Sequence, residues 1–239
     1  MAKKKTTGYY KPEIIAKFCA ELGKAKEDIR AALANGEEVH VKFSYENSKM
    51  GAVPSVSLLP FLTCPAICAT TCGAKCYAAK IANLRPAVRY SYAWNTVLAF
   101  DYPEIFWNDV DNMLKMSRYF RFHVSGDFAG AAYFAKAVEV IGNNPKCEVL
   151  AFTKQYDIVN AYMDENGGVL PTNFHLLFSG WGALEVPNKY NLPMSQVVFK
   201  GCEPLDDWKV CGGNCFNCAC RGVGCWTLQK GETVCFNVH

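Results

Sequence analysis

The sequence lacks a long apolar segment and a secretory leader. No apolar run reaches the roughly 18 residues that a membrane-spanning helix needs, which excludes an integral membrane helix. The lysines at positions 3–5 are followed by Thr-Thr-Gly-Tyr-Tyr rather than by the apolar core of a signal peptide. We therefore expect a cytoplasmic protein with no membrane partner.

A strong excess of charge of one sign is also missing. The chain has 25 Lys and Arg against 22 Asp and Glu, a formal net charge of +3. A protein that reads a nucleic-acid duplex needs several cations on one face. The basic residues are scattered among acids, so nucleic acid is not expected to be the main partner. Binding of a single strand by aromatic stacking stays open.

Cysteine, by contrast, is abundant. The chain has 13 cysteines, and without a secretion signal this number indicates a reducing compartment. An odd count fits poorly with complete disulfide pairing. Ten cysteines fall in two clusters. The other three are predicted as a buried helix residue (Cys19) and as residues of two strands (Cys147 and Cys235).

The first cluster has a cysteine at every fourth position, namely Cys64, Cys68, Cys72 and Cys76. Pro65 and Gly73 argue against a continuous helix, so a loop is predicted. Thiolates held close together repel one another and need a metal or disulfides to neutralise them. The alternative is a stripe of buried cysteines that act as small hydrophobic residues. We interpret the loop as a metal-binding segment.

The second cluster is rich in glycine as well as cysteine and can build little core. It contains Cys202, Cys211, Cys215, Cys218, Cys220 and Cys225. Cys215-x-x-Cys218 is a pair of the kind found in structural zinc sites, so zinc is a candidate metal here. The first cluster has no such pair. Iron–sulfur clusters are held by cysteine thiolates at more varied spacings and are favoured over zinc for both clusters.

Strands and helices alternate along the chain. The pattern predicts helices over 12–34, 77–100, 103–115, 129–141 and 157–164, with strands over 39–43, 53–59, 119–124, 147–152, 174–178, 196–199 and 233–239. Apolar strands that alternate with helices indicate a mostly parallel sheet. We expect an α/β fold, a partial (βα) barrel with a cysteine-rich C-terminal cap. The expected units are 1–46 (helix and short strand), 47–201 (partial barrel with the first cysteine loop) and 202–239 (cap).

Polar residues and cysteines follow the predicted strands directly. Sites in parallel sheets lie beyond the carboxyl ends of the strands, so Cys64, Asp127, Lys154, Trp181 and Cys202 should converge on one rim. Asp127 and Lys154 are candidate cofactor-binding residues. Asp127 can equally be a helix N-cap, and Lys154 can be a lone exposed lysine.

The combination of motifs resembles the bacteriophage gene product 88 family, from about residue 47 to the end. The motifs that carry the resemblance are Ser48-Lys49-Met50-Gly51, Ser57-Leu58, Cys64-Pro65, Cys72, Cys76-Tyr77-Ala78, Arg121–Phe128, Ala151–Lys154, Cys202, Cys215-x-x-Cys218, Cys225-Trp226 and Val234-x-Phe236-x-x-His239. The resemblance implies a phage or prophage origin and an iron–sulfur protein. Cys68, Cys211 and Cys220 depart from the family pattern and leave the ligand sets open.

A looser likeness to radical S-adenosylmethionine enzymes rests on the cysteine loop after the first strand and on Ser125-Gly126-Asp127 after the second. Their usual CxxxCxxC spacing is absent, because Cys72 comes one residue late after Cys68.

We therefore expect two [4Fe–4S] clusters in a phage-type protein of the infected host cell's cytoplasm, with S-adenosylmethionine as a candidate cosubstrate and a redox protein or small molecule as partner. The first cluster would use Cys64, Cys72 and Cys76, with Cys68 as fourth ligand or spectator. The second would use Cys202, Cys215, Cys218 and Cys225. The alternative is a zinc-binding structural or nucleic-acid-associated phage protein.

Overall fold

The computed structural model describes residues 8–237. The α-helices are α1 Pro12–Ala34, α2 Tyr77–Leu84, α3 Pro86–Asp101, α4 Pro103–Met116, α5 Ala131–Gly142, α6 Tyr156–Glu165 and α7 Cys215–Arg221. The strands are β1 Ser55–Val56, β2 Tyr119–Phe122, β3 Glu148–Thr153, β4 Phe174–Ser179, β5 Met194–Val198, β6 Lys209–Val210 and β7 Thr233–Asn237. Three short 3-10 helices are η1 Ala66–Ala69, η2 Cys72–Lys75 and η3 Gly224–Trp226. None of the described helices is long and apolar enough to cross a membrane.

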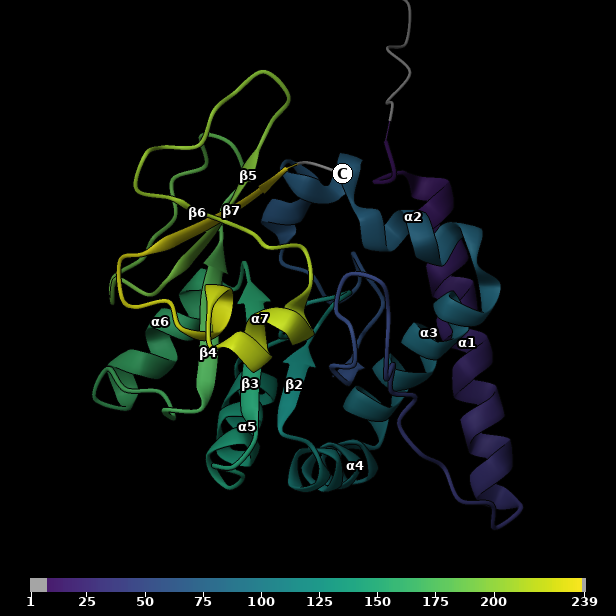
Figure 1. Cartoon of the computed structure of the whole chain (residues 1–239). Helices are drawn as coiled ribbons and strands as arrows, with labels where there is room; N and C mark the ends of the chain where they lie inside the picture. The colour runs from purple at the N-terminus through teal and green to yellow at the C-terminus, as the bar shows by residue number, and fades with distance from the viewer. Residues whose placement is uncertain (1–7, 238–239) are drawn as a thin grey trace, which may run out of the picture.

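All seven strands form one parallel sheet in the order β1-β2-β3-β4-β5-β7-β6. The sheet does not close, so the predicted α/β architecture with a partial barrel is confirmed. In Figure 1 the arrows of β2, β3 and β4 point the same way, toward the loops that follow the strands. Because the strands are parallel, these loops gather at a single edge, and residues far apart in the sequence meet there.

Side chains alternate between the two faces of the sheet, as the two-residue period of a strand requires. On one face Phe120, Val149, Ala151 and Phe174 belong to the main core, which also contains the buried sides of the helices from α1 to α6. Proline begins three of these helices, α1, α3 and α4, at the position where its fixed φ suits a first turn. This face is therefore covered by helices in the ordinary α/β manner.

The other face is covered by the C-terminal cap. Leu150 and Leu177 of the sheet pack there against Ala219, Trp226 and Leu228, which form a second core with Met50, Val53 and Val234. Figure 1 shows α7 in front of the sheet near β3 and β4, with α5 and α6 behind it. The cap is joined to the turn before β1, because the backbone N–H groups of Cys215 and Phe216 donate to the carbonyls of Lys49 and Met50.

The strand predicted over 39–43 is wrong. These residues are extended, but helix side chains rather than a neighbouring strand satisfy their backbone. Asp109 of α4 accepts from the Val41 N–H at 2.7 Å, and Asn95 of α3 accepts from the Lys42 N–H at 2.8 Å. The sequence shows the alternation of a strand, but it does not show that two helix side chains occupy the edge where pairing would occur.

Candidate functional site

Asp127 fixes the rim where β2 and β3 end. Its buried carboxylate accepts from the Thr153 hydroxyl at 2.6 Å, from the Lys154 N–H at 2.8 Å and from the Phe128 N–H at 2.8 Å. Burial raises the pKa of Asp127 to about 6, against the opposing effect of these hydrogen bonds and of the Lys154 charge. Asp127 does not cap α5, since Gly130 precedes that helix and no side chain caps it. Its carboxylate instead ties the loop after β2 to the end of β3.

Lys154 points along the rim from β3 toward β4. Its ammonium donates to the Ser179 hydroxyl at 2.6 Å, and its side chain is largely buried. Neighbouring thiols and burial raise the pKa of Cys68, Cys72 and Cys76, and the positive charge of Lys154 opposes this rise. The structure thus brings Asp127, Lys154 and the first cysteine loop together, as the order of strands and polar residues predicts.

The first thiol group, Cys64, Cys68, Cys72 and Cys76, lies in a loop shaped by η1 and η2. The neighbouring thiol of Cys64 is the largest cause that raises the pKa of Cys68, and the thiol of Cys68 is the largest cause that raises the pKa of Cys72. Burial raises the pKa of Cys76 to about 11, although its sulfur also accepts from the Ala79 N–H at 3.4 Å as the N-cap of α2. Of the four cysteines, Cys68 is buried and the other three are partly exposed.

Glycine lets this loop and its neighbours approach closely. A Cβ at Gly126, which has φ +82°, would lie 2.6 Å from Thr63 Oγ1 and 2.9 Å from Leu58 Cβ. Backbone hydrogen bonding also joins these segments, since the Leu58 N–H donates to the Ser125 carbonyl at 2.9 Å. The turn after β2 therefore packs directly on the segment that leads into Cys64.

Replacing Gly126 by alanine is expected to lower the free energy of unfolding by about 2–4 kcal/mol, because a left-handed backbone and a steric overlap act together. Urea denaturation measures this change. Gly23→Ala in α1 is the matched control, since its Cβ would meet nothing within 4 Å. We expect that control to stabilise the chain by about 0.5–1 kcal/mol. Equal effects of the two changes would contradict the close packing at Gly126.

The second thiol group consists of Cys211, Cys215, Cys218 and Cys225. Burial, followed by the neighbouring thiols Cys211, Cys215 and Cys218, raises the pKa of Cys225 to about 12 against the lowering effect of Arg121. The pKa of Cys218 is raised by burial and then by Cys211 and Cys215. All four cysteines belong to the cap, and their side chains pack against the second core.

Two cations face the second thiol group. Arg121 Nη1 lies 3.6 Å from Cys215 Sγ and 3.3 Å from Met50 Sδ, while the guanidinium covers the Phe152 ring at 4.7 Å. Its Nε is buried and has no hydrogen-bond partner among the described residues. Burial lowers the pKa of Lys49, and Cys211, Cys215 and Cys225 oppose that effect. Both cations favour the thiolate form of these cysteines.

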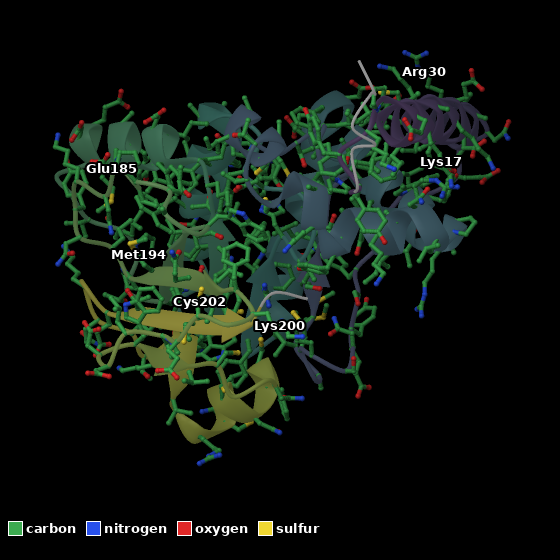
Figure 2. All side chains as sticks on the ribbon, turned by 90° about the horizontal axis from the view of Figure 1, so that it is seen from above. Lys17, Arg30, Glu185, Met194, Lys200 and Cys202 are labelled. Carbon is green, nitrogen blue, oxygen red and sulfur yellow. The ribbon has the colours of Figure 1, made fainter. Side chains whose placement is uncertain are left out.

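Cys202 does not join this group. It is exposed beyond β5, where its backbone N–H donates to the Phe199 carbonyl at 2.9 Å. Figure 2 looks onto this end of the sheet and labels Lys200 and Cys202 beyond β5, whose first residue is Met194. Trp181 packs edge-to-face on Phe199 at 5.3 Å, and the Lys75 ammonium lies 5.2 Å from the same ring. The ends of β4 and β5 thus reach the first cysteine loop through Phe199.

The remaining cysteines are outside both groups. Cys235 is a buried residue of β7, as predicted. Cys147 is buried but directly precedes β3, which begins at Glu148, so the prediction of a strand residue is wrong by one position. Cys19 is exposed on α1, and the prediction of a buried helix residue is wrong. Cys220 is also exposed. Cys19 is exposed because it lies on the outer side of α1. The buried residues of this helix are Ile14, Phe18, Ala25 and Ile29.

Within residues 8–237 no three His, Cys, Asp or Glu side chains stand in positions that could hold a metal ion. The kind of donor nevertheless fits an iron–sulfur cluster or zinc, since each group offers four thiols and a facing cation. In the first group the thiol of Cys64 raises the pKa of Cys68, and the thiol of Cys68 raises the pKa of Cys72, so these neighbours interact. At the second group, glycine at 212 and 224 lets the backbone approach the Cys218 sulfur, since a Cβ at these positions would lie 3.3 Å and 3.5 Å from it.

The fold and these groups define a cysteine-rich α/β protein with an open parallel sheet and two separate sets of four thiols. The family model described as Gene product 88 matches residues 20–224, so the chain belongs to the Gene product 88 family. The comparisons with curated proteins and with solved structures gave no match.

Proposed function

We propose that this Gene product 88 protein is an iron–sulfur protein that carries two [4Fe–4S] clusters, one at each thiol group. The observation that carries the proposal is the presence of two separate four-thiol groups, each beside a buried or half-buried cation. Such cations offset the negative charge of thiolate ligands. Free thiols throughout the chain suit the reducing cytoplasm of an infected host cell.

The ligand sets follow from the grouping. Cys64, Cys72 and Cys76 would hold the first cluster, with Cys68 beside them. At the second group the structure favours Cys211 over the expected Cys202, because Cys211 acts on the pKa of Cys218 and Cys225 whereas Cys202 is exposed beyond β5. The second set is therefore Cys211, Cys215, Cys218 and Cys225.

The first group is the better candidate for chemistry. An iron–sulfur cluster supplies one-electron transfer when bound. Lys154 can hold a carboxylate near the thiols by exchanging its contact with Ser179, and Asp127 fixes the Lys154 backbone. A carboxylate-bearing substrate such as S-adenosylmethionine fits this arrangement, and redox or radical chemistry at the rim is the reaction class that we propose.

Metal analysis of protein purified without oxygen tests the proposal. We expect about eight iron and eight sulfide per chain, with broad absorption in the blue. Stoichiometric zinc without that absorption would refute the iron–sulfur proposal and favour zinc as a structural metal. The Cys215-x-x-Cys218 pair is the feature that keeps zinc as the second candidate.

Cys68 decides whether the first cluster has an open iron. Its thiol interacts with both neighbours, since Cys64 raises its pKa and Cys72 lowers it, so a spectator role in shaping the loop is open to Cys68. We expect Cys68→Ala to keep the full iron content, which three ligands and a free position would explain. Iron and sulfide assays measure this. Loss of about half the iron would show a fourth thiolate ligand and a closed site.

A further inference from the structure

A cavity of about 820 Å³ opens at the end of the sheet opposite to the rim that carries Asp127, Lys154 and the first thiol group. It is lined by residues that precede β2, β3 and β4, by the last turn of α7 and by η3. Figure 1 shows α7, whose last turn contributes to this lining, in front of β3. The size of the cavity is that of a small-molecule site. Neither thiol group lines it.

Three cations line the cavity, namely Arg118, Lys146 and Arg221. Among the described residues none of the three forms an ion pair, whereas six other Lys and Arg side chains do. The one carboxylate in the lining is Glu148, which His175 Nε2 holds at 2.6 Å. The cavity therefore gathers uncompensated positive charge and favours an anion.

Aromatic rings also line the cavity. Tyr119 and Trp226 pack edge-to-face at 5.3 Å, and His175 lies 5.8 Å from Trp226. The Arg118 guanidinium sits over the Tyr119 ring at 5.3 Å. A half-buried tyrosine beside a planar guanidinium is a surface on which a flat ring stacks well.

A second cavity, of about 780 Å³, lies between α4 and α5 and differs from the first in the charge of its lining. Its cation Lys136 is paired with Glu139 at 2.7 Å, and Glu104 and Asp111 add negative charge. That cavity does not favour an anion. It also supplies a matched control, because Lys136 is an exposed lysine at a cavity of similar size.

We propose that the cavity at the incoming ends of β2, β3 and β4 binds a nucleoside phosphate. The phosphate lies among Arg118, Lys146 and Arg221, which donate charge-assisted hydrogen bonds to it. The base stacks beside Tyr119 and Arg118. The site is independent of the thiol groups, so it does not rest on the iron–sulfur proposal.

Calorimetric titration of the full chain with AMP, adenosine and inorganic phosphate tests this site. AMP is expected to bind at least tenfold more tightly than either fragment, and its affinity should fall as salt rises from about 0.05 to 0.3 M. The variants Arg118→Gln, Lys146→Gln and Arg221→Gln are each expected to weaken AMP about three- to tenfold. Lys136→Gln should leave the affinity unchanged.

A free nucleotide and the 5′ end of a nucleic-acid strand both carry a nucleoside phosphate, and a further titration distinguishes them. A 5′-phosphorylated oligonucleotide that binds more tightly than AMP, and loses affinity in the same three variants, would identify the end of a nucleic-acid strand as the ligand. Equal or weaker binding would identify a free nucleotide. The proposal is overturned if AMP shows no binding up to about 5 mM, if AMP binds no better than inorganic phosphate, or if the three variants match Lys136→Gln.

Discussion

Replacing Asp127 by alanine is expected to lower the free energy of unfolding by about 3–5 kcal/mol. The change leaves three donors without their acceptor, the Thr153 hydroxyl and the N–H groups of Lys154 and Phe128. Each buried donor that loses its partner costs about 1–3 kcal/mol, partly offset by the carboxylate's own desolvation. Chemical denaturation of the variant measures the loss.

Asp157→Ala is the control for the Asp127 change. Asp157 is an exposed acid in the first turn of α6, and its removal should cost less than about 1 kcal/mol. A similar, small effect of Asp127→Ala would show that the hydrogen bonds of the rim contribute little to stability.

The same carboxylate makes stability depend on pH in a defined direction. The pKa of Asp127 is about 6 in the folded chain, above the value of 3.8 for an unperturbed aspartate. The folded state then holds more protons than the unfolded state between these values, so stability falls as pH rises through this window. Between about pH 5 and 7.5 we expect a loss of about 1–2 kcal/mol that Asp127→Asn abolishes. A wild-type and variant difference that stays constant over this range would contradict the raised pKa.

The second large effect concerns the cap. Cys211→Ser is expected to remove about half of the iron, because Cys211 lies with Cys215, Cys218 and Cys225 beneath the cap. The segment 211–225 is rich in glycine and has little apolar surface of its own, so loss of a metal there should also loosen α7. Trypsin cleavage after Arg221 provides a second measurement that does not depend on iron.

Cys202→Ser is the matched control, since Cys202 is an exposed cysteine of the same segment. It should keep about eight iron per chain and the trypsin resistance of the parent. The opposite pattern, with iron lost from Cys202→Ser and kept in Cys211→Ser, would restore the ligand set expected from the family motif and contradict the grouping in the structure.

Much of the rim could be predicted from the sequence. Asp127 and Lys154 follow predicted strands, and parallel strands bring their carboxyl ends to one edge whatever the helices between them do. The sequence also predicts that the four cysteines of the first thiol group lie near one another, because they fall within 13 consecutive positions and cannot separate far. The strand predicted over 39–43 is wrong because the side chains that satisfy this backbone, Asn95 and Asp109, are more than 50 residues away in the sequence.

The sequence by itself determined the alternation of strands and helices and the number of thiols, since apolar periodicity and residue type are local properties. Only the tertiary structure decided which thiols form the second group and what faces them. The segment after residue 202 has no apolar period that would fix its path, so its contacts with the sheet select Cys211 and leave Cys202 outside. The pleat of β2 places Phe120 and Phe122 on the helical face and Arg121 on the cap face. Arg121 meets Cys215 there because the chain returns across the sheet 94 residues later.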